Sequence, residues 1–293
     1  MDIKIGDIVG RRSYDCDIAF KVHDILRQGD GSIIILKGVS LRILADAPED
    51  DVVKLPQSRI NDVELFYKKR IGKLDERIRK LCRRADERAG KAFAARVDNN
   101  MFKRPGKILH LDGDNSYLDM CMKSYKEYGI EAYGRNISEA EQPKRVTELL
   151  IQYNPDILVL TGHDSKLKSS TSSKSADSIG NYRNSRYYIE AVKEARKHEP
   201  SLDDLVIFAG ACQSFFEGIM QAGANFASSP DRILIHALDP VMICKIIAYT
   251  PIDKIAPLQQ LLGNTISGIK GVGGIQTRGK YRDGMPKTLN DKL

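Results

Sequence analysis

The chain has 293 residues, 42% of them hydrophobic, which is enough for one α/β domain of ordinary size and a smaller module. It carries 46 Lys and Arg against 39 Asp and Glu, and its five cysteines are scattered without paired spacing. This pattern argues against a disulfide framework and, with no C-x-x-C or H-E-x-x-H motif, against zinc. The first residues lack the pattern of a signal peptide, and no apolar run approaches the ~18 residues of a membrane span. We expect a cytoplasmic protein without metal, cofactor or membrane contact.

Residues 1–60 contain short apolar segments separated by turns, which predicts a small β-barrel of the SH3 kind. Its expected strands cover residues 5–9, 19–22 and 32–37. Such a module suits docking to a partner, but no residue in it identifies one.

Residues 61–104 are predicted to form a basic linker helix. Within residues 65–104 there are 14 Lys or Arg and 5 Asp or Glu, so the rest of the chain is slightly acidic. The apolar residues recur at steps of three and four and define one amphipathic helix: Ile71, Leu74, Ile78, Leu81, Ala85, Ala89 and Phe93. The basic face suits acidic partners or nucleic acid, but a solvated linker helix is the commoner explanation. We do not expect nucleic-acid binding.

Residues 105–293 alternate between strands and helices, which predicts a mostly parallel sheet with helices on both faces. The expected strands are 107–111, 130–133, 156–161, 205–209 and 233–236, and the expected helices are 116–128, 139–153, 186–198, 213–222 and 240–248. The polar, serine-rich residues 165–178 cannot bury a core. They could cover a substrate, be cleaved by the enzyme itself, or form a plain flexible insertion. The glycine-rich tail from Gly263 is expected to be irregular.

Two of the expected strands end near residues able to do covalent chemistry. His163 follows residues 156–161, and Cys212 follows residues 205–209. The carboxyl ends of parallel strands line one edge of a sheet, so these residues meet there if their strands are neighbours. An imidazole or a helix amino terminus lowers a thiol pKa from ~8.5 to roughly 3.5–7.5, and the helix expected over 213–222 begins just after Cys212. The pair predicts a cysteine hydrolase with His163 as acid/base.

Structural explanations exist for both residues. A lone cysteine after an apolar run is usually a small buried hydrophobic residue, and a lone histidine usually has a structural role. The remaining cysteines and histidines fall in apolar helices, within strands or outside the sheet, where catalysis is not expected. The presence of a cysteine and a histidine at the ends of two expected strands favours a catalytic role over a structural one.

The motifs Leu-Thr-Gly-His-Asp, ending at Asp164, and Gly-Ala-Cys-Gln-Ser, ending at Ser214, resemble those of the caspase-like superfamily of cysteine peptidases, which includes clostripains and legumains. That likeness covers roughly residues 105–250. Over its full length the chain resembles the YabG family of sporulation-specific cysteine proteases. The resemblance implies a caspase-like α/β fold and an endopeptidase with Cys212 as nucleophile. It also implies processing of spore-coat and related proteins in the mother cell.

One residue departs from the superfamily pattern. A glycine usually follows the histidine, and its amide helps to bind the oxyanion, but here Asp164 takes that place. The backbone amides of Asp164 and Cys212 are therefore the expected oxyanion donors, and each good donor contributes on the order of 3 kcal/mol in the transition state.

Acidic residues suggest the substrate preference. Asp112 and Asp114 follow the first expected strand of the α/β domain, and Asp239 follows a later one. A carboxylate in a partly desolvated pocket selects a basic guest, so we expect cleavage after Arg and less readily after Lys, with Asp114 the leading pocket residue. Alternatively, Asp112 and Asp114 cap the following helix. Basic residues in the serine-rich stretch, Lys166, Lys168 and Lys174, offer sites for self-cleavage.

Two other functions fit the same residues. Asp112 and Asp114 resemble the D-x-D start of haloacid-dehalogenase-type phosphohydrolases, in which they would serve as nucleophile and acid/base with Mg²⁺. The same strand end could belong to a non-enzymatic, receiver-like binding module. Neither function needs Cys212 or His163 at the sheet edge. A near match to a P-loop at residues 274–281 ends in Tyr281 instead of Ser or Thr and is interpreted as chance.

Overall fold

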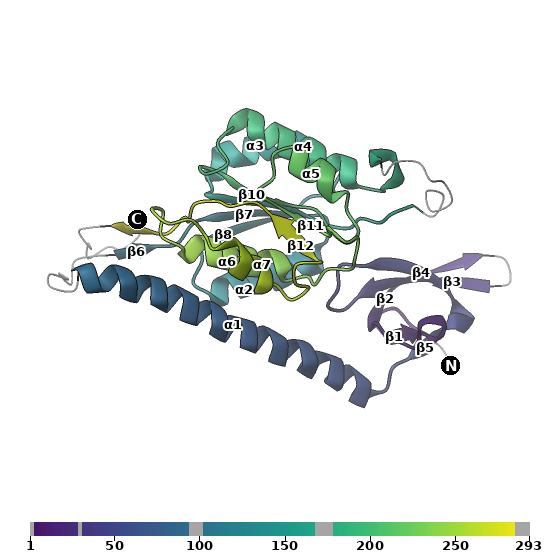
Figure 1. Ribbon diagram of the computed structural model, residues 1–293. Coiled ribbons are helices and arrows are strands. Elements are labelled where there is room, and N and C mark those ends of the chain that lie inside the picture. The colour runs from purple at the N-terminus through teal and green to yellow at the C-terminus, as the bar shows by residue number, and fades with distance from the viewer. Residues whose placement is uncertain (1–2, 29–30, 94–101, 168–177, 285–293) are drawn as a thin grey trace.

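The computed structural model describes residues 3–28, 31–93, 102–167 and 178–284 (Figure 1). The chain forms an amino-terminal antiparallel sheet, a long helix and a larger unit built on a mostly parallel sheet. Lys168 and Lys174 lie outside the described residues, as do the side chains of Leu81, Ala85, Ala89 and Phe93. Within the described ranges, no helix is long and apolar enough to cross a membrane.

The amino-terminal sheet has the strand order β4-β3-β2-β1-β5, all antiparallel. Its strands are β1 (Ile8–Arg11), β2 (Phe20–Gln28), β3 (Gly31–Gly38), β4 (Leu44–Pro48) and β5 (Val52–Lys54). Alternate residues of β2 and β3 face one side because side chains alternate along a strand, and they bury Phe20, Val22, Ile34 and Leu36 in a small core. The predicted β-rich start is therefore present, while its closure into an SH3-like barrel stays a prediction.

Helix α1 (Gln57–Phe93) leads from this sheet along the larger unit. Leu74 and Ile78 are buried against the larger core, and Tyr67 and Ile71 pack beside them. Their spacing of three and four residues places them on one face of the helix, as predicted. Among the described side chains of the helix, the basic residues Lys68, Lys69, Arg70, Lys73 and Arg77 are exposed.

The larger sheet has the strand order β12-β11-β10-β9-β7-β8. Its strands are β7 (Ile108–Asp112), β8 (Ala132–Asn136), β9 (Ile157–Thr161), β10 (Val206–Ala209), β11 (Phe226–Ser228) and β12 (Val272–Gly274). All pairings are parallel except that of β11 with β12. The order reverses between β7 and β9, and ligands of doubly wound sheets bind outside the carboxyl ends of strands at such a switch point.

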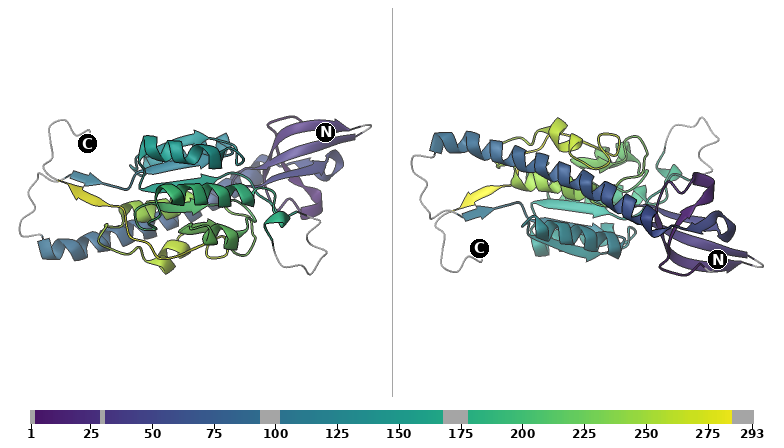
Figure 2. Two further views of the ribbon diagram at one scale, coloured as in Figure 1. Left: turned by 90° about the horizontal axis from the view of Figure 1, so that it is seen from above. Right: turned by 90° about the horizontal axis from the view of Figure 1, so that it is seen from below.

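Helices cover both faces of this sheet, as Figures 1 and 2 show. One face carries α3 (Gln142–Tyr153), α4 (Ser185–His198) and α5 (Phe216–Gln221). The other carries α2 (Asn115–Glu127), α6 (Asp239–Tyr249) and α7 (Leu258–Gly263), with α1 beneath them. Each face has its own buried apolar cluster, and the central strands are buried on both sides. The prediction of a mostly parallel α/β sheet is confirmed.

Three predicted elements differ. Residues 233–236 are not a strand, because their backbone instead bonds with the loop between β3 and β4. The helix predicted over 213–222 begins only at Phe216, since Gln213 has a φ of 57° that a right-handed helix cannot continue. The tail predicted to be irregular contains β12, and it also contains β13 (Arg282–Gly284), which pairs with β6 (Phe102–Arg104).

Candidate active site

Three neighbouring strands bring the predicted site residues to one edge of the sheet. β9 pairs with β10 on one side and with β7 on the other, all in parallel. His163 follows β9, Cys212 follows β10, and Asp114 follows β7. The turn before Cys212 needs glycine, because Gly210 has a φ of 106° and a Cβ there would lie 3.1–3.3 Å from three other side chains.

The ring of His163 is held by Asp114. His163 Nε2 lies 2.8 Å from Asp114 Oδ2, and the ring is 19% exposed. A carboxylate accepts only from a protonated nitrogen, so this contact places the proton of the neutral ring on Nε2. Nδ1 is buried and has no hydrogen-bond partner among the described residues. It is therefore the nitrogen with a lone pair available as a base.

The backbone of His163 is fixed from two sides. Its amide donates to Glu139 Oε1 at 2.6 Å, and its carbonyl accepts from Asn184 Nδ2 at 2.9 Å. The Glu139 carboxylate fits because Gly113 and Gly162 lack side chains, since a Cβ at either would lie within 2.4 Å of Oε1. Glu139 could not be identified from the sequence, because it lies 24 residues before the histidine it contacts and belongs to neither motif.

The thiol of Cys212 is closed off from solvent, with the residue only 1% exposed. Its Sγ accepts a hydrogen bond of 3.2 Å from the backbone N–H of Ile235. Burial raises the pKa of Cys212 to about 12, although the Ile235 amide and the charge of Arg42 act in the opposite direction. The thiol is therefore neutral in this arrangement. Among the described residues, no hydrogen bond joins this thiol to His163, although the sheet brings the two residues to the same edge.

The residue after His163 ties the two strand ends together. Asp164 Oδ2 accepts from Ser214 Oγ at 3.0 Å and from Ser185 Oγ, while Oδ1 accepts from the amides of Ser165 and Asn184. Ser214 Oγ also accepts from the Ala211 amide at 2.8 Å. This network fixes the loops that carry His163 and Cys212 relative to one another. Within the described ranges, the amides of Asp164 and Cys212 have no acceptor.

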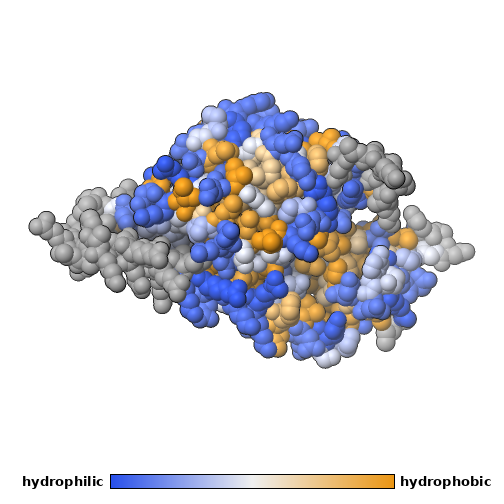
Figure 3. Space-filling model, viewed as in Figure 1, coloured by the Kyte–Doolittle hydropathy of each residue, from blue (hydrophilic) through white to orange (hydrophobic). Residues whose placement is uncertain are grey.

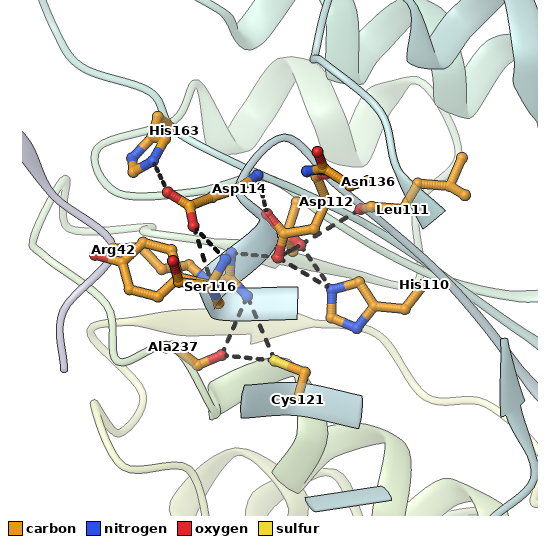
Figure 4. Close-up of polar contacts among 12 residues, drawn as sticks. Arg42, His110, Leu111, Asp112, Asp114, Ser116, Cys121, Asn136, His163 and Ala237 are labelled. Carbon is orange, nitrogen blue, oxygen red and sulfur yellow. Dashed lines mark hydrogen bonds and ion pairs between the residues drawn. The ribbon is translucent and has the colours of Figure 1, made fainter. Parts of the chain in front are cut away.

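The two acidic residues at the end of β7 have cationic partners from β3 and the loop that follows it, and Figure 4 shows the partner of Asp112, Arg42. Asp112 Oδ2 lies 2.7 Å from Arg42 Nη1, and both side chains are fully buried. Asp114 Oδ1 lies 2.5 Å from Lys37 Nζ. Burial acts to raise the pKa of each carboxyl, but Arg42 lowers that of Asp112 to about 2, and hydrogen bonds from His163 and Lys37 hold that of Asp114 below its usual range.

Asp114 also caps α2, because it accepts from the amides of Ser116 and Tyr117. The alternative interpretation of this aspartate as a helix cap is therefore correct, and it combines with the contact to His163. Asp239 is fully buried, and its oxygens accept from the amides of His236, Ile266 and Ser267. In this closed arrangement Asp112, Asp114 and Asp239 all have partners within the chain.

The loop between β3 and β4 covers the site. The Arg42 amide donates to Ile235 O, and the Ala237 amide donates to Ser40 O. Tyr117 OH lies 2.6 Å from Gly38 O and 2.7 Å from Leu41 O, and its single proton is shared between these carbonyls. The segment 235–237, which bonds to the thiol, is thus fixed by the amino-terminal sheet. Lys37 and Arg42 could not be identified from the sequence, because they lie 77 and 70 residues from the aspartates they contact.

The described residues contain no group of three or more His, Cys, Asp or Glu arranged to hold a metal ion. The carboxylates of Asp112 and Asp114 instead face Arg42 and Lys37, an arrangement that does not suit the Mg²⁺ of a phosphohydrolase.

Comparison with known proteins identifies the family. Residues 4–286 match the family described as YabG peptidase U57. The chain is 42% identical over 295 residues to the sporulation-specific protease YabG of Bacillus subtilis, covering 99% of this chain and all of that protein. The chain belongs to the YabG peptidase family. It is thus a member of a family of proteases that act in sporulation, and the full-length resemblance noted from the sequence is confirmed.

Among solved structures, a protein from Burkholderia pseudomallei described as pilus assembly-related is 18% identical, with a TM-score of 0.27. It covers 43% of this YabG-family chain and 79% of its own, and the likeness is too weak to define a common fold.

Proposed function

We propose that this YabG-family protease is a cysteine endopeptidase in which Cys212 is the nucleophile, His163 is the acid/base and Asp114 orients the imidazole. The observation that carries the proposal is the 2.8 Å contact between Asp114 Oδ2 and His163 Nε2. This contact leaves Nδ1 without a hydrogen-bond partner among the described residues. His163 follows β9, and the neighbouring strand β10 leads to the Cys212 thiol. A base oriented by a third group beside a nucleophile is the general arrangement for covalent catalysis.

The chemistry has two stages. His163 Nδ1 takes the proton of the Cys212 thiol, and the sulfur bonds to the carbonyl carbon of the substrate peptide. The carbon–nitrogen bond then breaks as Nδ1–H gives its proton to the leaving amine, which produces a thioester. Water attacks the thioester, gives a proton to Nδ1, and the carbon–sulfur bond breaks to restore the thiol. The unpaired amides of Asp164 and Cys212 bind the oxyanion.

The described arrangement is a resting state, because a thiol that is 1% exposed cannot meet a polypeptide. Opening requires segment 235–237 to separate from the β3–β4 loop, which breaks the bonds of Ile235 and Ala237 to that loop. Once Cys212 is less buried its pKa falls, since burial is the main reason that the pKa is raised. Access and activation of the nucleophile are thus coupled.

We propose a preference for Arg or Lys, which the contacts of Asp114 in the resting state support. One of its oxygens holds His163 and the other holds the ammonium group of Lys37, which also lies 4.9 Å from the centre of the Tyr117 ring. A carboxylate beside an aromatic face is a suitable site for a cation. We propose that Lys37 occupies the place of the substrate's basic side chain until the site opens. Asp112 and Asp239 have buried partners of their own and are secondary candidates.

The relative in Bacillus subtilis is named for sporulation. We propose that this chain acts in the mother cell on spore-coat and related proteins, and that it cleaves itself at basic residues such as Lys166 and Lys174. The amino-terminal module is proposed to comprise residues 1–60. Because it covers the proposed active site, it would contribute to the docking of protein substrates there.

The decisive experiment compares wild type with Cys212→Ala, His163→Ala and Cys244→Ala on a spore-protein extract, with new peptide termini mapped by mass spectrometry. Cys244 is a matched control because it is also fully buried, but in α6 within the core. We expect Cys212→Ala and His163→Ala to lose cleavage to a similar extent, since members of one catalytic unit act non-additively. Substantial cleavage by Cys212→Ala would disprove the assignment. New termini following Asp or Asn would disprove the basic preference.

A further inference from the structure

A groove runs between α1 and the loop that follows α7. Its volume is about 470 Å³, and α1 contributes most of its lining through Phe66, Lys69, Arg70, Lys73, Leu74 and Arg77. The opposite wall comes from the loop at residues 263–268, where it supplies two glycines and Thr265. Figure 3 shows hydrophilic residues along the lower edge of the molecule, where Figure 1 places α1.

The groove concentrates positive charge without neutralising it. Lys69, Arg70, Lys73 and Arg77 are all exposed, and none has an ion pair with a described residue. The neighbouring acids of the helix are already engaged, because Asp75 pairs with Lys245, and Glu76 pairs with Lys80. No acidic residue lines the groove. Like charges spaced three and four residues apart destabilise a helix. The cluster therefore does not stabilise α1, and binding of an anionic partner would explain its presence.

The groove is also close to the candidate active site. Tyr67, the residue after Phe66, has its ring 4.7 Å from that of His236. Ser267 Oγ, in the loop that forms the other wall, accepts from the His236 amide at 2.9 Å. The residue before His236 is Ile235, whose amide bonds to Cys212 Sγ. Burial, Arg42 and Arg70 together lower the pKa of His236 to about 3.

We propose that the groove is a second binding site, which holds an acidic segment of a protein substrate away from the bond that is cleaved. Guanidinium groups pair with carboxylates in bidentate fashion and lysines as point charges, while Phe66 and Leu74 provide apolar contacts. A polypeptide can present both carboxylates and apolar side chains to such a groove, whereas the phosphate backbone of a nucleic acid presents only charge. A polypeptide is also what a protease binds. On this proposal, the basic residues of α1 attract acidic substrates to the enzyme and select them over neutral ones. This role rests on the proposed function, because it concerns the substrate of that site.

The test measures binding of a fluorescein-labelled glutamate-rich peptide to the full chain carrying Cys212→Ala, by fluorescence anisotropy. We expect saturable binding that weakens steeply with added NaCl, and no binding of the matched glutamine-rich peptide. Adding Lys69→Glu with Lys73→Glu should weaken binding about tenfold, since two attractive contacts become repulsive. The control pair, Lys68→Glu with Arg79→Glu, has the same change in charge on the same helix but does not line the groove. It should leave the affinity within about twofold of the parent.

Equal weakening by the two double variants would overturn the proposal, because binding would then follow net charge alone. Single-stranded DNA that competes more strongly than the peptide, and with the same dependence on Lys69 and Lys73, would overturn the polypeptide assignment. Since the assay uses a chain without the Cys212 thiol, its outcome is independent of the proposed chemistry. Retained cleavage by Cys212→Ala would refute the cysteine mechanism only, whereas absent peptide binding would refute the groove only.

Discussion

The guanidinium group of Arg42 lies 2.7 Å from the carboxylate of Asp112, and neither side chain is exposed to solvent. Arg42 also donates to Ala237 O, while Asp112 Oδ1 accepts from the Asp114 amide. One ion pair thus connects the amino-terminal sheet with the segment beside the thiol and with the residue that holds His163. The amino-terminal sheet is in this sense connected to the proposed catalytic site.

Replacing Arg42 with Ala should lower the free energy of unfolding by about 3–5 kcal/mol, because it leaves the Asp112 carboxylate buried without its partner. Urea unfolding in the Cys212→Ala background measures this without self-cleavage. The double variant Arg42→Met with Asp112→Leu removes both charges and should be less destabilised than Arg42→Ala alone. A loss below about 1 kcal/mol in Arg42→Ala would contradict a buried, dry ion pair.

Asp114→Asn should lower kcat by roughly 10²–10⁴-fold with a smaller effect on KM, because an amide does not fix the Nε2–H form of His163 as a carboxylate does. Asparagine remains a good helix cap, so α2 should be preserved. ¹⁵N NMR of the histidine ring provides a direct measurement. In the wild type we expect a protonated Nε2 and an unprotonated Nδ1, and in Asp114→Asn a mixture. An unchanged tautomer together with unchanged kcat would show that Asp114 only caps the helix.

The pH dependence of alkylation should report the closed state of Cys212. Its pKa is raised to about 12 by burial, so the reactive thiolate is scarce at neutral pH and the rate of modification by iodoacetamide should increase about tenfold per pH unit with no plateau up to pH ~10. A thiol of ordinary pKa would level off near pH ~9.5. The peptide containing Cys212 is followed by mass spectrometry, with the partly exposed Cys16 as internal reference. An early plateau would mean that the site is open in solution.

Lys37→Met should lower KM for peptides with Arg before the cleaved bond by about threefold, because the substrate no longer competes with Lys37 for Asp114. Lys21→Met is the matched control. Lys21 is exposed and lies opposite Lys37 on the neighbouring strand β2, but has no contact with Asp114. Steady-state kinetics on Arg and Gln peptides separate the effects. A higher KM in Lys37→Met would show that Lys37 assists binding instead of occupying the site.

The positions of His163 and Cys212 could be predicted from the sequence, because each follows an apolar run and a parallel sheet aligns the carboxyl ends of its strands. The cap on α2 could also be predicted, since Asp114 stands directly before an amphipathic run and needs only local hydrogen bonds. The amphipathic face of α1 follows in the same way from the spacing of Ile71, Leu74 and Ile78. These features depend on near neighbours in the chain or on the regular geometry of a sheet.

Other features were decided by the tertiary structure alone. The start of α5 was misplaced because the left-handed conformation of Gln213 depends on the turn packed around it. Residues 233–236 had the composition of a strand, but their hydrogen bonds go to the loop around Arg42. The cationic partners of Asp112 and Asp114 are Arg42 and Lys37, which lie 70 and 77 positions away in the chain. Such contacts form only when the amino-terminal sheet packs against the larger one, and no local pattern in the sequence encodes that packing.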